Sequence, residues 1–438
     1  MKNFAKIFFV TLLVFFSYSC NPNLDIPTPS SGSADFTTTV ALGGGYLCGY
    51  QNGALSKSGQ EKCIANLLAE QFKLLGGESF EQPYMPDDIG LGLNSRPWES
   101  VYVSASYLGY KTDCEGVTSL SPLKKLMSAS DANPYLQAAA GTNKNYAVPF
   151  VTTTDISNVA IQNVYYNRIS KNLGVANLLS EANNTAHTFS IMWLGMEDIY
   201  EYARFGGYNK TIPTTSTFAT NIDNIVNTLT STGKTKGVIA SIPDIEYFPY
   251  YRYVDPYSVD LDEHLCDSLN QATGNIFNYK VGKNGFAIEY PKQSGMYRQM
   301  TTYECVLLNV PSDSLKCYKM GVFYGMPDRY VLDSMELQTI KTAIREYNVE
   351  IKKVAERYGI AFVDVSDFYQ QLQSGILYNG VSFTNTFISG GFFSLDGFYP
   401  NQKGYSMLSN EFVKAINLKY GASVPTVNCK DCDGIKFP

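Results

Sequence analysis

The stretch "VALGGGYLCGYQNGALSKSGQEK", residues 40–62, decides the fold. The apolar run Thr37–Leu42 ends at three consecutive glycines, Gly43–Gly45, a pattern typical of a buried strand that enters a loop. An amphipathic pattern over Gln60–Leu75 then predicts a helix. A strand, a glycine-rich loop and a helix in this order are the opening unit of a parallel α/β sheet.

The same alternation continues along the chain. Further strands are predicted at Phe189–Leu194, Val238–Ile242 and Ala361–Val365, and further helices at Ala219–Ser231, Glu336–Tyr358 and Met407–Tyr420. Apolar strands between amphipathic helices predict a parallel sheet with helices on both faces. The rhythm fails over residues 247–326, where "YFPYYRYVDPY" (Tyr247–Tyr257) begins an irregular, tyrosine-rich insertion over one end of the sheet.

Composition excludes several classes of protein. The 438 residues are 45% hydrophobic and 17% charged, as expected of a folded chain rather than a disordered one. The net charge of −6 argues against a nucleic-acid partner, because phosphate binding needs a basic face. The spacing of Gly43–Gly45 fits neither dinucleotide-binding nor phosphate-loop motifs, so no cofactor is expected.

The N-terminus, "MKNFAKIFFVTLLVFFSYSC", has the pattern of a secretory signal. Two lysines precede the apolar run Ile7–Phe16, which is too short to span a bilayer. Cys20 resembles the modified cysteine of a bacterial lipobox, which implies a signal peptide over residues 1–19, acyl chains such as palmitate on Cys20, and a flexible tether over residues 20–35. An ordinary signal peptide with an incidental cysteine is the alternative.

Eight further cysteines are compatible with disulfides in an exported chain: Cys48, Cys63, Cys114, Cys266, Cys305, Cys317, Cys429 and Cys432. Their spacing does not decide the connectivity. Cys429 and Cys432 could be half of a zinc site, but a second pair at metal spacing is missing. A disulfide clip at this position is the expectation, and no metal site is predicted.

Several ordered blocks of the chain resemble the SGNH, or GDSL, hydrolase family, and in particular its lipoproteins from Bacteroidetes. The blocks are residues 40–72, "NYAVPF" (145–150), "WLGMEDIYEYARFGG" (193–207), "GVIASIPDIEYFPYY" (237–251), residues 347–365, and residues 390–425. The resemblance implies a flavodoxin-like three-layer α/β/α domain over residues 36–425, with the insertion at 247–326 and a tail over 426–438 that contains Cys429 and Cys432.

Members of this family use a serine nucleophile, a histidine base, and an oxyanion hole made by a glycine N–H and an asparagine side chain. The resemblance implies that Gly45 stands at the serine position, Phe150 at the glycine position, Glu197 at the asparagine position and Tyr399 at the histidine position. The aspartate before the histidine is retained as Asp396. All four residues that name the family are replaced.

The residues at these positions are unsuited to the hydrolysis that the family catalyses. Gly45 has no side chain, Tyr399 has an ordinary pKa of about 10 and is a poor base at neutral pH, and Glu197 puts negative charge where an oxyanion would form. Cys48 could be a displaced nucleophile, but no histidine is in register to activate it, and a buried or disulfide-bonded cysteine is the better interpretation.

The two histidines of the chain offer little chemistry. His187 is expected to cap or pack beside a strand, and His264 lies among acidic residues that could hold calcium. A solvated acidic loop is the default interpretation of that group, which comprises Asp255, Asp260, Asp262 and Glu263.

The sequence therefore predicts a catalytically inactive hydrolase-like domain that is used for its surface. The first hypothesis is an accessory or structural subunit that binds an outer-membrane β-barrel or multiprotein complex. A surface glycan- or lipid-binding protein is the alternative, with a remodelled cleft formed by Tyr46, Phe150, Glu197 and Tyr399. A residual esterase or acyl hydrolase is the third. The tyrosine cluster at 247–257 could serve an interface or pack the insertion onto the domain.

The expected location is the outer membrane, where the lipid anchor holds the body at the cell surface, with the periplasmic face as the alternative. Three short motifs resemble Bacteroidetes O-glycosylation sites, at Ser268, Ser314 and Ser334. An intact mass equal to that of the unglycosylated lipoprotein would exclude this modification.

Overall fold

The computed structural model describes residues 28–94, 99–231, 233–292 and 294–438. Its central sheet consists of β1 (Thr39–Gly43), β7 (Asn145–Ala147), β8 (Phe189–Trp193), β9 (Lys236–Ala240) and β16 (Ala361–Val363), all parallel. The order across the sheet is β16-β9-β8-β1-β7, which is the flavodoxin-like order 2-1-3-4-5 when these strands are counted along the chain. The α/β fold class predicted from the sequence is confirmed.

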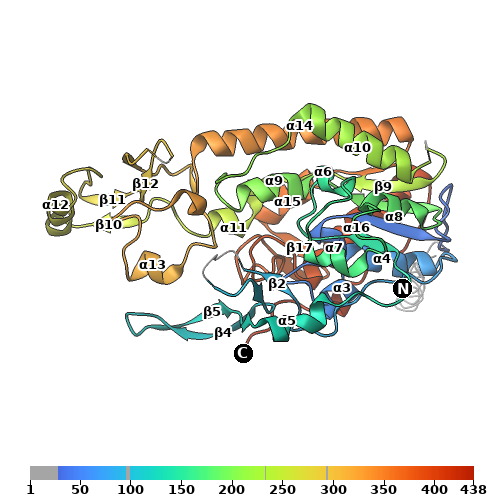
Figure 1. Cartoon of the computed structure of the whole chain (residues 1–438), viewed down its shortest axis with the longest axis horizontal. Coiled ribbons are helices and arrows are strands. Elements are labelled where there is room, and N and C mark those ends of the chain that lie inside the picture. The colour runs from blue at the N-terminus through green and yellow to red at the C-terminus, as the bar shows by residue number, and fades with distance from the viewer. Residues whose placement is uncertain (1–27, 95–98, 232, 293) are drawn as a thin grey trace, which may run out of the picture.

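Helices cover both faces of the sheet (Figure 1). The main helices are α4 (Ile64–Lys73), α8 (Leu178–Asn184), α9 (Met196–Ala203), α10 (Thr215–Leu229), α14 (Ser334–Tyr358), α15 (Ser366–Ser374) and α16 (Gln402–Tyr420). On one face α8 and α14 contact the strands and α10 packs between them, while α16 contacts the other face beside α4. Strands β1 and β8 lie in the middle of this three-layer arrangement and are buried along their whole length.

Shorter elements complete the chain. The short helices are α2 (Gly45–Cys48), α3 (Lys57–Glu61), α5 (Ala129–Leu136), α6 (Thr153–Ile156), α7 (Val164–Ile169), α11 (Pro249–Arg252), α12 (Glu263–Ala272) and α13 (Ser312–Lys316). The short strands are β2 (Gly92–Leu93), β3 (Tyr102–Val103), β4 (Tyr107–Thr112), β5 (Thr118–Leu123), β6 (Leu126–Met127), β10 (Val259–Leu261), β11 (Gly282–Asn284), β12 (Ala287–Glu289), β13 (Tyr297–Gln299), β14 (Cys305–Val306), β15 (Val331–Leu332), β17 (Ile376–Tyr378) and β18 (Val381–Phe383).

Local sequence explains the helix boundaries. The Asp333 side chain accepts hydrogen bonds from the first backbone N–H groups of α14, and the Glu336 carboxylate accepts one from the Asp333 N–H. Gly359 ends the helix at φ 65°. The single helix predicted over Gln60–Leu75 is wrong, because α3 ends at Glu61 and α4 begins at Ile64. Cys63 between them is extended, and its thiol caps α4.

A lobe of residues 254–331 lies beside the sheet and occupies most of the predicted insertion (Figure 1). It has its own apolar core, formed by side chains from Val259 to Val331. The hairpin β4–β5, which the sequence did not predict, reaches this lobe. A disulfide joins Cys114 in the hairpin turn to Cys317 at the end of α13, and Lys316 forms ion pairs with Asp113 and Glu115 of the same turn.

Both ends of the described chain differ from expectation. The Ser33 N–H donates to Tyr420 O at 2.9 Å and the Ser423 N–H donates to Ser30 O at 2.8 Å, so residues 28–35, predicted to be flexible, belong to the folded body. The tail is fixed to α16, where the Asn410 side chain exchanges two hydrogen bonds with the Val427 backbone.

The predicted clip between Cys429 and Cys432 is wrong. Both are buried free thiols, and the Cys429 sulfur accepts a hydrogen bond from the Ser406 hydroxyl at 2.8 Å. The disulfide found in the structure is the one between Cys114 and Cys317, which are 203 residues apart in sequence. Among the residues described, no helix is both long enough and apolar enough to cross a membrane.

Candidate functional site

The candidate site lies at the carboxyl ends of β1 and β8, which are neighbours in the sheet. The strand order reverses between these two strands: β7 follows β1 on one side, and β9 and β16 follow β8 on the other. In an open parallel sheet this position is the usual place for a ligand or catalytic site. Strand β1 leads into Gly45, the first residue of α2, and β8 leads through Gly195 into Glu197 in the first turn of α9. Tyr399 comes from the loop before α16.

Tyr399 fills the space beside Gly45. A β-carbon added to Gly45 would lie 2.5 Å from Cε1 and 2.8 Å from the hydroxyl oxygen of Tyr399. Real Cβ atoms do not approach other heavy atoms so closely, so any side chain at residue 45 requires the tyrosine to move. The tyrosine at the predicted base position therefore occupies the volume that a side chain at the predicted nucleophile position needs.

Glu197 joins these two segments. One carboxylate oxygen, Oε1, accepts hydrogen bonds from the Gly45 N–H at 2.8 Å and from the Tyr399 hydroxyl at 2.9 Å. The other oxygen, Oε2, is buried and has no hydrogen-bond partner among the described residues. Glu197 is only 2% exposed. The segments that contain Gly45, Glu197 and Tyr399 are thus tied together by a buried carboxyl group.

Asp396, the retained aspartate, has a structural role here. Its Oδ1 accepts hydrogen bonds from the N–H groups of Phe398 and Tyr399, and its Oδ2 accepts one from the Gly53 N–H at 2.9 Å. These bonds hold the turn that inserts the Tyr399 ring and connect it to the loop after α2. These bonds give Asp396 a structural role that does not require a histidine beside it.

Phe150, at the predicted oxyanion position, has a backbone that glycine would adopt without strain. Its φ is 63°, in the left-handed region that a bulky residue rarely occupies. Its ring contacts Tyr50, with centroids 5.1 Å apart, and the Arg204 guanidinium carbon, 4.4 Å from the ring centre. A glycine-type backbone beneath a phenylalanine side chain is the arrangement expected if an oxyanion glycine was replaced and its space filled.

The remaining volume is occupied by stacked rings. Phe398 stacks on Tyr200 with centroids 3.8 Å apart and on Phe248 at 4.9 Å, while Tyr46 lies 5.3 Å from Tyr399. Phe248 belongs to the tyrosine-rich cluster at 247–257, whose role the sequence left open. Phe248, Tyr250 and Tyr251 are buried against this site and Tyr253 is exposed, so most of the cluster serves packing.

The predicted cleft residues are therefore brought together, but in a packed interior. Tyr46 and Glu197 are 2% exposed and Tyr399 is 0% exposed; Phe150 alone is partly exposed. A glycan or lipid could not reach the three buried side chains without displacing the rings above them. The sequence missed Tyr50, Tyr200, Phe248 and Phe398 as members of this cluster, and the aromatic run at 247–257 was the one visible signal for them.

Burial changes the ionisation of the two acidic residues in the first turn of α9. Burial raises the pKa of Glu197 to about 7, because the Gly45 and Tyr399 hydrogen bonds that favour its charged form only partly offset the loss of hydration. Burial also raises the pKa of Asp198 to about 6, although Asp198 accepts bonds from the Thr153 N–H and hydroxyl. Both groups favour the folded state most when protonated.

We expect the protein to lose stability as the pH rises through 7, partly because of Glu197. A folded-state pKa of about 7 against 4.5 gives a contribution that is fully present below pH 4.5 and lost above pH 7. Between pH 5 and pH 8 the Glu197 contribution amounts to about 2.5 kcal/mol. Urea unfolding of the wild type and Glu197→Gln at both pH values measures it: the loss on going to pH 8 should be smaller in the variant by about that amount. An unchanged loss in Glu197→Gln, equal to that in the exposed-site control Glu263→Gln, would contradict the assignment.

The other candidate residues are placed as follows. Cys48 is buried, its thiol donates to Gly45 O at 3.4 Å, and burial raises its pKa well above the ordinary value, so it is not an activated nucleophile. The His187 ring nitrogens lie 2.7 Å from Thr185 O and 2.8 Å from Leu229 O, where the ring packs beside the sheet.

The acidic residues around His264 have structural roles. Asp262 caps α12 by accepting a bond from the Leu265 N–H, and Asp255 accepts one from the Tyr257 N–H. Within the described part of the chain, no group of three or more histidine, cysteine, aspartate or glutamate residues could hold a metal ion.

The three serines predicted to be O-glycosylated differ in exposure. Ser268 and Ser334 are exposed, on α12 and at the start of α14, and Ser314 is partly exposed on α13. Cys20 and the signal peptide predicted over residues 1–19 lie outside the described residues.

No protein-family model and no curated protein match this chain. Among solved structures, a putative GDSL-like lipase from Parabacteroides merdae is 9% identical and covers 89% of this chain and 100% of its own, with a TM-score of 0.35. An α/β hydrolase enzyme from the metagenome of Lake Arreo, Spain, is 11% identical and covers 62% of this chain and 70% of its own, with a TM-score of 0.28. The strand order of the chain itself, β16-β9-β8-β1-β7, shows the α/β fold.

Proposed function

We propose that this chain is a catalytically inactive SGNH-type protein that acts as an accessory or structural subunit and binds an outer-membrane β-barrel or multiprotein complex. The observation that carries the proposal is the Tyr399 ring, which lies where a side chain at residue 45 would have to be. An enzyme of this class needs a nucleophile, a base and an open oxyanion site at this position. Here those places hold a glycine, a tyrosine and a buried carboxyl group.

The proposed setting is the outer membrane. Cys20 is the lipidated residue, the acyl chains hold the protein to the membrane, and the folded body faces the cell surface, with the periplasmic face as the alternative. The apolar run Ile7–Phe16 before Cys20 supports this part of the proposal.

Exposed aromatic side chains support a protein partner. Of the eleven that the described residues expose, seven lie on the lobe or on the hairpin attached to it: Tyr107, Tyr110, Tyr297, Tyr303, Tyr318, Phe323 and Tyr324. Aromatic residues dominate the energetics of protein interfaces because they bury large areas at little cost in conformational freedom. We therefore assign the partner-binding surface to the lobe and the hairpin.

The test is purification of the tagged protein from its native outer membrane in mild detergent, with the co-purifying chains identified by mass spectrometry. We expect a stoichiometric β-barrel or complex partner, and we expect Tyr303→Ala/Tyr318→Ala to lose it, because these side chains are 79% and 70% exposed on the lobe. The matched control is Tyr84→Ala/Tyr208→Ala, which removes two exposed rings from the main body. Recovery of the wild-type protein alone would contradict the proposal.

A further inference from the structure

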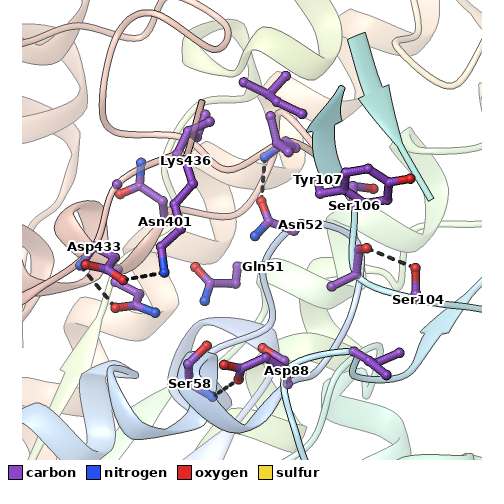
Figure 2. A pocket seen from close by; sticks show the side chains of 18 of the residues that line it. Gln51, Asn52, Ser58, Asp88, Ser104, Ser106, Tyr107, Asn401, Asp433 and Lys436 are labelled. Atoms are coloured by element: carbon purple, nitrogen blue, oxygen red, sulfur yellow. Dashed lines mark hydrogen bonds and ion pairs between the residues drawn. The ribbon is translucent and has the colours of Figure 1, made fainter. Parts of the chain in front are cut away.

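A pocket of about 800 Å³ lies outside the filled site. Its walls come from the stretch after α2 up to the start of α3, from residues 88–89 and 104–108, from Lys125, from the turn before and the first residue of α16, and from the tail at 433–438 (Figure 2). Its volume lies within the range of small-molecule sites. It shares no residue with the group formed by Gly45, Phe150, Glu197 and Tyr399.

The loop after α2 lies between the pocket and the filled site beside Gly45. The Asn52 N–H donates to the Ser394 hydroxyl at 2.8 Å, and the Asn52 side-chain oxygen accepts from the Leu395 N–H at 3.0 Å. These bonds fix the floor of the pocket to the turn that carries Asp396 and Tyr399. The pocket is therefore built on a well-held part of the fold.

The Gln51 side chain is the feature of the pocket that points most clearly to ligand binding. Gln51 is 4% exposed, it lines the pocket, and its amide makes no hydrogen bond to any described residue, although its backbone is paired with Ala54. Figure 2 shows the amide within the pocket, between Asn52 and the tail residues. A buried amide that gains no bond from the protein loses free energy unless a ligand or water supplies one.

The other lining groups define the chemistry that would suit the pocket. Asn52 and Ser106 add an amide and a hydroxyl, and Tyr107 and Phe437, which are 48% and 61% exposed, add aromatic rings. This combination suits a ligand with many hydroxyl groups and an apolar C–H face, because the hydroxyls pair with amides and the C–H face stacks on rings.

The charges argue against an ionic ligand. The charged side chains that line the pocket are two aspartates and two lysines, so neither positive nor negative side chains are in excess: Asp88, Asp433, Lys125 and Lys436. Asp433 and Lys436 are paired with each other at 2.9 Å, and Asp88 accepts a hydrogen bond from the Ser58 N–H at 2.7 Å. A phosphate or carboxylate ligand would find no free cationic cluster here.

We propose that this pocket binds a short neutral saccharide, of two or three sugar units, with the Gln51 amide at its base and the Tyr107 and Phe437 rings at its rim. The site goes beyond the proposed accessory function and does not depend on it. It also gives a saccharide a place in the molecule that the filled interior beside Gly45 does not.

The test is saturation-transfer NMR and thermal unfolding of the purified protein with cellobiose, maltose, lactose and chitobiose. We expect at least one of them to bind saturably and to raise the melting temperature, and we expect Gln51→Ala to weaken that binding at least tenfold. Gln51→Ala should fold normally because its amide makes no bond in the protein. Gln371→Ala, at an exposed position of α15 outside the pocket, is the matched control and should bind as the wild type does.

A second variant, at the rim of the pocket, tests the contribution of the rim separately from that of Gln51 at the base. Tyr107→Ala removes an exposed ring and is expected to reduce affinity without changing the fold. Saturable binding by none of the four sugars would overturn the proposal, and so would binding that is equal in Gln51→Ala, Tyr107→Ala and the control. A failed saccharide test would leave the co-purification result intact, since that experiment tests Tyr303 and Tyr318, which do not line the pocket.

Discussion

Replacing Tyr399 with alanine is expected to lower the free energy of unfolding by about 5 kcal/mol. The ring is fully buried among Tyr46, Tyr50 and Phe398, so its removal leaves a cavity. The hydroxyl also donates to Glu197, which would keep a single hydrogen-bond partner in its buried position. Urea unfolding measures the change, and Tyr399→Phe, which removes the hydroxyl alone, should cost about 1–2 kcal/mol.

The same contact predicts a strong coupling between residues 45 and 399. Gly45→Ala in the wild type should destabilise the protein by about 2 kcal/mol, because the new β-carbon would meet the Tyr399 ring. In the Tyr399→Ala background that clash is gone, and the same change should be close to neutral or slightly stabilising at the start of α2. A double-mutant cycle that finds the two changes additive, or a cost below 2 kcal/mol for Tyr399→Ala, would show that the ring does not fill the site as described.

Removing the disulfide between Cys114 and Cys317 is expected to cost about 4 kcal/mol. The bond closes a loop of 203 residues and ties the turn of β4–β5 to the end of α13, so its loss frees a long segment of the unfolded chain. Cys114→Ser/Cys317→Ser tests it by urea unfolding, and hydrogen exchange should be faster in the hairpin and in α13 than in the central sheet.

The control for this prediction is a reducing agent. It should destabilise the wild-type protein and leave the double variant unchanged, since the six remaining described cysteines are free thiols. The ion pairs of Lys316 with Asp113 and Glu115 are partly exposed and are expected to contribute little by themselves. A loss below 1 kcal/mol in the double variant would mean that the lobe is held to the hairpin without the bond.

Much of the fold could be predicted because its strands are apolar runs of ordinary length. β1 and β8 lie within two residues of their predicted bounds, and α14 and α16 begin earlier than predicted but end at Tyr358 and Tyr420 as expected. The edge strand β7 was missed as a strand because three residues, Asn145–Ala147, carry no periodicity. The hairpin β4–β5 was missed because its exposed, mixed sequence lacks a clean alternation of apolar and polar residues.

The candidate site was harder to predict than the fold. The sequence placed Gly45, Phe150, Glu197 and Tyr399 through a family resemblance, and the structure brings these residues together in one region. The sequence could not predict that Tyr399 would donate a hydrogen bond to Glu197, or that the rings of residues 200, 248 and 398 would stack on one another beside these two residues. Such contacts depend on side-chain packing between segments far apart in sequence. The pocket beside Gln51 had no sequence signal, since it is formed by several segments that are far apart in sequence.

The most direct test of the central claim is a rate measurement. We would follow the hydrolysis of p-nitrophenyl acetate by the purified wild-type protein, Tyr399→Phe and Glu197→Gln. A filled, inactive site predicts no initial burst, no saturation with substrate, and the same slow rate for all three proteins. Saturable turnover in the wild type that falls at least tenfold in either variant would contradict the account, because Tyr399 and Glu197 would then be acting on a substrate rather than filling its place.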